Sequence, residues 1–232
     1  GILCINDTVG WSVEAQQSSN VIWRDVAVFS FTTNGDGIGT ISSSSVLVEN
    51  CFVRGYDDCI TIKNKFGSAG MNNVTVRGCT SLGYVNSDGI TVGFEEYNPV
   101  SNILVSNCDI IGSTGYNRSP SGAHSAFSIV DSGLGPISNI TFDNIRCENE
   151  VLQNNMEFAI TDGTLYHGNG PGAISNILVK DVTWLNNRPI YVTGYSLTNL
   201  VQNITFQNCW IDGRLLAASD SEFYTNQLTS GL

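Results

Sequence analysis

The sequence predicts an all-β protein, a single-stranded right-handed parallel β-helix of about seven coils. The first observation is a phrase of the type Ser/Asn-Asn-Val/Ile-x-Val/Phe-x-Asn/Asp/Gly that returns along the chain. The second is that each copy alternates apolar and polar residues, as a strand with one buried face does. The third is that Gly, Asn, Asp and Ser gather between the copies, where short strands need their turns.

The repeat sets the order and spacing of the expected strands. The phrase begins at Ser18, Ser44, Asn72, Ser101, Ser138, Ser175 and Gln202. Its Asn, or the equivalent residue, falls at positions 20, 45, 73, 102, 139, 176 and 203, so the intervals are 25, 28, 29, 37, 37 and 27 residues. Short strands at a coil-length interval favour a β-helix, in which each turn of chain stacks on the one before. A propeller repeat is longer, and a leucine-rich repeat needs a leucine frame that this chain lacks.

Loops, corners and ends follow from the same pattern. The two 37-residue intervals predict inserted loops over 113–124 and 161–172. The repeated Asn residues predict corners with left-handed backbone and stacked side-chain amides. Cys51, Cys79 and Cys108 recur in similar contexts and are expected to be stacked, buried thiols. We assign residues 1–217 to the β-helix, which shows no N-terminal cap, and residues 218–232 to a polar tail that leaves it.

Composition narrows the possible partners. The chain has 10 basic and 21 acidic residues and a net charge of −11, which argues against nucleic acid. No apolar run approaches membrane-spanning length, so we expect no membrane partner. We expect a monomer that needs no metal ion or other cofactor.

Three aspartates are spaced so that the coils bring them together. Asp36 lies in "TNGDGIG", and Asp57 and Asp58 lie in "GYDDCITIKN", 21 and 22 residues later. That spacing is close to one coil without inserts, and residues one coil apart stack at roughly 4.8 Å. The spacing therefore predicts three neighbouring carboxyl groups on one face of the solenoid.

Close carboxyl groups cannot all ionise, so one is expected to hold a proton while another remains a base. That pair of states is what hydrolysis of a glycosidic bond requires, because one group protonates the leaving oxygen and the other activates water. Two other readings of the same residues stay open, a calcium site and Asp-Gly turns without chemistry.

The two motifs resemble those of the polygalacturonase family, glycoside hydrolase family 28, whose usual pattern is Asn-Thr-Asp-Gly followed by Asp-Asp-Cys. The resemblance implies a pectin-lyase-like solenoid, with residues 1–217 as the catalytic domain of a secreted, extracellular enzyme that acts on a polysaccharide. Carried over by position, Asp57 would be the general acid. Asp36 and Asp58 would hold and activate the water, so that hydrolysis inverts the anomeric centre.

The chain also departs from the family pattern. "NSDGITVG", with Asp88, stands where the family has Gly-His-Gly, and no Arg-Ile-Lys segment is found. The resemblance favours pectin-type polymers, whereas these departures favour a neutral α-glucan such as dextran. A calcium-dependent polysaccharide lyase and a non-catalytic carbohydrate-binding solenoid are further alternatives. The residues expected to bind substrate around the aspartates are Asn34, Tyr56, Lys63, Asp88, Glu95 and His124.

Overall fold

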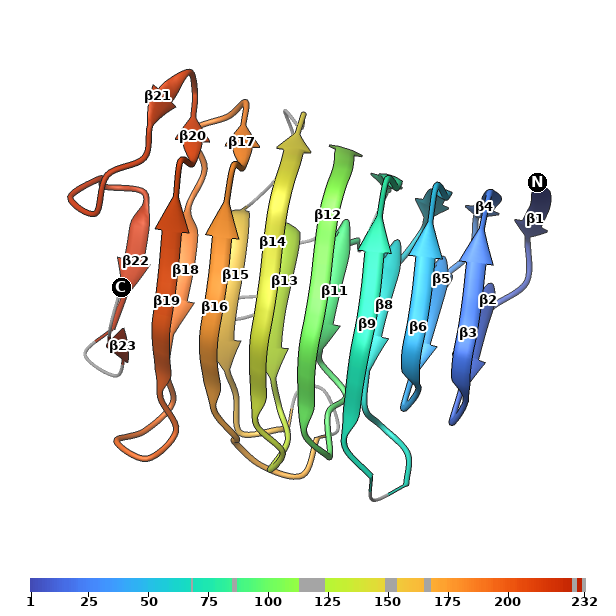
Figure 1. Cartoon of the computed structure of the whole chain (residues 1–232), viewed down its shortest axis with the longest axis horizontal. Helices are drawn as coiled ribbons and strands as arrows, with labels where there is room; N and C mark the ends of the chain where they lie inside the picture. Colours follow the sequence, from blue (N-terminus) through green and yellow to red (C-terminus); the bar gives the residue numbers. More distant parts are fainter. Residues whose placement is uncertain are drawn as a thin grey trace.

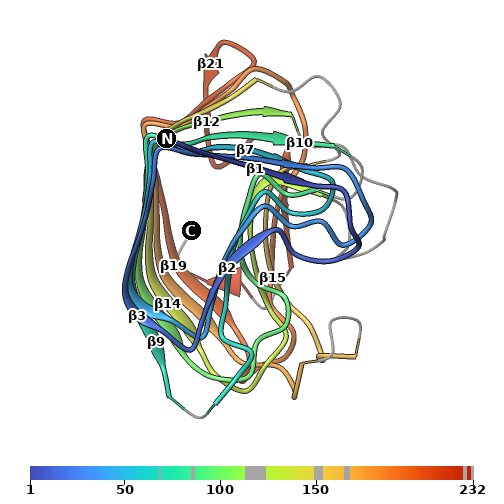
Figure 2. The same ribbon diagram turned by 90° about the vertical axis from the view of Figure 1, so that its right-hand side faces the viewer.

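A computed structural model describes residues 1–67, 69–84, 87–112, 124–148, 154–164, 168–226 and 229–230. Within these ranges the chain forms strands and turns and contains no helix, so it has no helix that could cross a membrane. The strands form two sheets that run along one long axis (Figure 1). Figure 2, which looks along that axis, shows successive coils superposed on one another. The predicted parallel β-helix is confirmed.

The eight-stranded sheet is parallel throughout, and its spatial order is also its order in the chain. Its strands are β2 (Val13–Gln16), β5 (Ile38–Ile41), β8 (Ile60–Lys63), β11 (Ile90–Gly93), β13 (Ser125–Asp131), β15 (Asn154–Ile160), β18 (Ile190–Thr193) and β22 (Phe223–Thr225).

The 15-stranded sheet bends around the rest of the solenoid, and its strands pair in parallel except for β20 with β21. Its strands are β1 (Ile2–Asn6), β3 (Ser19–Arg24), β4 (Val26–Ser30), β6 (Ser44–Glu49), β7 (Phe52–Gly55), β9 (Met71–Arg77), β10 (Thr80–Gly83), β12 (Val100–Gly112), β14 (Ile137–Cys147), β16 (Ile174–Lys180), β17 (Thr183–Trp184), β19 (Val201–Gln207), β20 (Trp210–Ile211), β21 (Arg214–Leu215) and β23 (Thr229–Ser230).

The corners of the coils explain why the repeat phrase carries Asn. Seven equivalent residues, at the positions named for the repeat, have φ between 56° and 59°, the left-handed region that Asn tolerates better than most residues. The amides also stack as predicted. Asn203 Nδ2 donates to Asn176 Oδ1 at 3.1 Å, and Asn176 Nδ2 donates to Asn139 Oδ1 at 3.2 Å. Backbone conformation favours Asn at these corners, six of which carry it and one of which carries Ser45, and side-chain hydrogen bonding adds to that preference along Asn139, Asn176 and Asn203.

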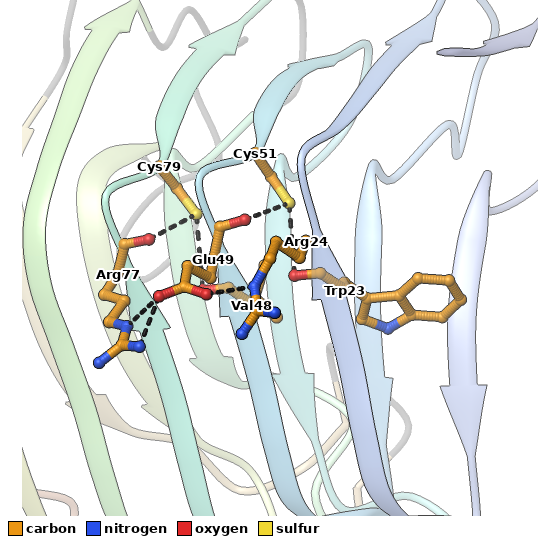
Figure 3. A network of polar contacts seen from close by, with 7 residues as sticks. All are labelled: Trp23, Arg24, Val48, Glu49, Cys51, Arg77 and Cys79. Carbon is orange, nitrogen blue, oxygen red and sulfur yellow. Dashed lines mark hydrogen bonds and ion pairs between the residues drawn. The ribbon is translucent and has the colours of Figure 1, made fainter. Parts of the chain in front are cut away.

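None of the seven cysteines forms a disulfide, and all except the partly buried Cys4 are buried, as predicted for the thiols of Cys51, Cys79 and Cys108. Cys51, Cys79 and Cys108 occupy matching positions one residue before the parallel register of β7, β10 and β12. Figure 3 shows the first two of them beside a surface ion network in which Glu49 accepts hydrogen bonds from Arg24 and Arg77. The network connects three successive coils across β3, β6 and β9.

Two expectations about loops and ends meet different outcomes. The first expected insert falls on residues 113–123, which lie outside the described residues. The second contains only turns in its described parts, 161–164 and 168–172. The segment from Ala218 was expected to leave the solenoid. Instead, β22 pairs in parallel with β18 and β23 with β19, because Phe223 meets Ile190 in register and extends the apolar column by one coil.

A buried carboxyl group at the end of β13 makes the stability of the fold depend on pH. Asp131 is fully buried, and its Oδ1 accepts a hydrogen bond from the Gly133 N–H at 3.0 Å. Burial outweighs the hydrogen bonds and raises the pKa of Asp131 from 3.8 to about 7. Because the folded-state pKa exceeds the unfolded one, the stabilisation is fully present below about pH 4 and is lost as the pH rises through about 7.

We therefore expect Asp131→Asn to remove a destabilisation that reaches at most about 4 kcal/mol above neutral pH. Urea unfolding at about pH 5 and about pH 8 measures it. The wild type should lose more free energy of unfolding between these two conditions than the variant does. Asp109→Asn, at an exposed aspartate, is the matched control. An identical pH difference in wild type and Asp131→Asn would contradict the assignment.

Candidate active site

The strand register brings three aspartates of successive coils into one column. Ile38 of β5 pairs with Ile60 of β8, and Ile60 pairs with Ile90 of β11. Two positions before these three isoleucines lie Asp36, Asp58 and Asp88. Backbone hydrogen bonds join the turns that carry them. Gly37 N–H donates to Asp58 O, and Cys59 N–H donates to Asp88 O, both at 2.9 Å. A Cβ at Gly37 would lie 2.5 Å from Cys59 O, so glycine is required for this close approach.

The members of the trio Asp36, Asp57 and Asp58 differ in exposure. Asp36 is 4% exposed and Asp58 is 6% exposed, whereas Asp57 is only partly buried. Asp58 Oδ1 accepts from the Asp88 N–H at 2.9 Å, and Asp57 Oδ1 accepts from the Asp58 N–H at 3.1 Å. Asp57 is therefore the most exposed carboxyl group of the trio, and Asp36 and Asp58 are its buried members.

Burial decides the protonation of the two inner carboxyl groups. Burial raises the pKa of Asp36 to about 7, although the Lys63 ammonium opposes the shift. Burial also raises the pKa of Asp58 well above its usual range, and the nearby carboxylates of Asp57, Asp88 and Asp36 add to that rise. The cluster therefore retains a proton close to neutral pH, as an acid–base pair requires.

Lys63 is held by carboxylates of the protein itself. Its side chain is 5% exposed, and its Nζ lies 3.3 Å from Asp36 Oδ2 and 3.0 Å from Glu95 Oε2. Burial alone would lower the pKa of Lys63, but the surrounding carboxylates, Asp36 first, outweigh burial and raise it. Lys63 in turn lowers the pKa of Glu95 against the effect of burial. Lys63 therefore remains charged and is engaged within the site.

Asp88 and His124 form a second pair beside the trio. Asp88 is 1% exposed and accepts hydrogen bonds from the Ser125 N–H, at 2.7 Å, and from the Ser128 hydroxyl. His124 Nδ1 lies 3.4 Å from Asp88 Oδ1, and His124 Nε2 has no hydrogen-bond partner among the described residues. Asp58, Asp88 and His124 each offer one ligand atom within 4.8 Å of the others, so they can hold a divalent cation.

The remaining expected residues lie on the turns around this cluster. Asn34 is exposed and has a φ of 56° on the turn that carries Asp36. The ring of Tyr56, the residue before Asp57, lies 5.7 Å from the ring of Tyr84. Sequence reasoning missed Glu157 of β15, which is 3% exposed and has a pKa raised by burial and by Asp88. Its signal was a lone Glu at an alternating position of the apolar run "NNMEFAI".

The chain is similar to known proteins in sequence and in fold. The model of glycosyl hydrolases family 28 matches residues 3–213. The chain is 28% identical to a polygalacturonase of Saccharomyces cerevisiae over 74% of its own length and 43% of that protein. It is 27% identical to polygalacturonase QRT2 of Arabidopsis thaliana over 75% of its own length and 38% of that protein.

The fold of a family 28 exopolygalacturonase of Yersinia enterocolitica matches with a TM-score of 0.56 and 15% identity, over 95% of this chain and 43% of that chain. This chain spans about half the length, or less, of the curated relatives that it matches. The family model covers nearly the whole sequence, which confirms the predicted resemblance. The chain therefore belongs to glycosyl hydrolases family 28.

Proposed function

We propose that this protein hydrolyses O-glycosyl bonds of a pectin-type polysaccharide by single displacement, with Asp36, Asp57 and Asp58 as its acid–base machinery. The observation that carries the proposal is the trio itself: two buried carboxyl groups with raised pKa values lie close to one partly exposed carboxyl group. The names of the relatives, which are polygalacturonases, support a polymer of galacturonate as substrate.

In this mechanism Asp57 donates its proton to the glycosidic oxygen as the bond from that oxygen to the anomeric carbon breaks. A water molecule held by Asp36 and Asp58 attacks the anomeric carbon from the opposite face. The proton that water gives up passes to the ionised carboxylate of this inner pair. The new hydroxyl group therefore has inverted configuration, and the leaving chain keeps the proton from Asp57.

The pairs around the trio have supporting roles. Lys63 holds the side chains of Asp36 and Glu95 in place through its ion pairs with them. Its positive charge keeps one of these two carboxyl groups ionised next to a carboxyl group that holds a proton. The Asp88 N–H orients Asp58 by its hydrogen bond to Oδ1. His124, Asn34 and Tyr56 stand at the rim, where they contact the sugar. We infer a secreted, monomeric enzyme that needs no metal ion.

Release of reducing ends from polygalacturonate, rhamnogalacturonan, dextran and mixed α-glucans tests the function. We expect release from polygalacturonate or rhamnogalacturonan that is unchanged by a chelator, and proton NMR of the first product should show the inverted anomer. Release that a chelator abolishes would instead assign a cation to Asp58, Asp88 and His124. Release from dextran alone would overturn the substrate class, and release from no polymer would overturn the hydrolase.

A further inference from the structure

An aromatic cluster lies on the turns that carry the trio. Phe31 is 48% exposed and Tyr84 is 50% exposed, so part of each ring is open to solvent. The guanidinium carbon of Arg54 lies 4.5 Å from the centre of the Phe31 ring and 4.8 Å from that of Tyr84. Together with Tyr56, which contacts Tyr84, these residues form the cluster that we call the Arg54 clamp.

The register explains how three coils build the clamp. Phe29 of β4 pairs with Arg54 of β7, and Gly55 pairs with Gly83 of β10. Phe31, Tyr56 and Tyr84 therefore hold matching positions, two residues after Phe29 and its partners. The Tyr56 and Asp57 N–H groups both point to Gly35 O, at 3.2 and 3.4 Å, so the turn of the clamp is bonded to the turn that leads to Asp36.

Within the part of the chain that the structure describes, Arg54 has no acidic partner, although the protein is strongly acidic. Its guanidinium donates one hydrogen bond to the Ser30 carbonyl, and it makes no ion pair with any carboxylate of the described residues. Five N–H groups in a planar fork are suited to a carboxylate, and the rings on either side fix the plane of the fork. Lys63, by contrast, already serves Asp36 and Glu95.

We propose that the Arg54 clamp is a subsite for a uronate residue of the polysaccharide, a role that rests on the proposed function. The guanidinium of Arg54 pairs with the uronate carboxylate, and the exposed parts of Phe31 and Tyr84 pack against sugar rings. The carboxylate of the substrate is then recognised by residues on the turns that precede the eight-stranded sheet. This accounts for recognition of a uronate without an Arg-Ile-Lys segment.

Binding to a catalytically inactive background tests the subsite without relying on hydrolysis. Calorimetry on Asp57→Asn compares an oligogalacturonate with its fully methyl-esterified form, which has lost the negative charges. Adding Arg54→Gln should raise Kd for the acid form about tenfold or more and change Kd for the ester less than about twofold. Arg54→Lys should fall between, because an ammonium lacks the fork.

Arg24→Gln, at the end of β3 and outside the clamp, is the control and should leave both Kd values unchanged. Thermal unfolding checks that every variant folds. An equal rise for acid and ester would show that Arg54 only packs the rings, and no rise for either would remove the subsite. Both outcomes overturn the proposal. If wild type releases no reducing ends but Arg54 still governs binding of the acid form, the subsite stands and the hydrolase fails.

Discussion

Asp57→Asn is expected to lower kcat for polysaccharide hydrolysis by about a hundredfold to ten-thousandfold. Asparagine keeps the shape of the side chain but cannot give a proton to the glycosidic oxygen. The free energy of unfolding should change little, because Asp57 is only partly buried and the loss of its negative charge relieves repulsion on Asp58. Initial rates of reducing-end release at saturating polymer measure the effect.

An aryl glycoside of the same sugar separates the roles within the trio. Its leaving group departs without protonation, so Asp57→Asn should regain much of its rate on this substrate. Asp58→Asn should not, because the water still lacks one of the two carboxyl groups that hold and activate it. Asp109→Asn, at an exposed aspartate paired with Arg146, serves as the control and should match wild type on both substrates. If Asp57→Asn keeps more than about half of the wild-type kcat on polymer, Asp57 is not the general acid.

Local periodicity was sufficient to predict the solenoid and the column of aspartates. The repeat phrase fixes strand and corner together, since Asn at the corner and alternating apolar residues after it are short-range requirements. The 21- and 22-residue steps from Asp36 to Asp57 and Asp58 then imply stacking, because no insert interrupts that coil. These features depend on residues close in sequence or one coil apart.

Features that depend on several coils at once could not be predicted from the sequence. Lys63 was expected to contact substrate, but Glu95, which follows the neighbouring strand β11, lies 3.0 Å from the buried ammonium and pairs with it. The Arg54 clamp needs the register of three strands before Phe31 and Tyr84 can be seen to flank one guanidinium. Glu157 approaches Asp88 only through the pairing of β13 and β15, in which it stands beside Ser128.

Lys63→Met is expected to cost about 3 kcal/mol of the free energy of unfolding at about pH 8. Methionine fills much of the same volume, but it leaves the buried Asp36 and the partly buried Glu95 without the cation that both contact. The cost should shrink at about pH 5. Without Lys63 the pKa of Asp36, already raised to about 7 by burial, rises further, so this carboxyl group takes up a proton and the unpaired charge disappears.

Lys180→Met is the matched control, because the Lys180 ammonium is 3.1 Å from Asp143 in an ion pair whose side chains are 33% and 29% exposed. An exposed pair contributes at most about 1 kcal/mol, and Asp143 stays solvated when the lysine is removed. Chemical unfolding of both variants at the two pH values decides the matter. A Lys63→Met cost no larger than that of Lys180→Met, or one that does not change with pH, would mean that Asp36 is neutral in the folded protein even with Lys63 present. Asp58 would then be the only one of the two inner carboxyl groups left to act as the base.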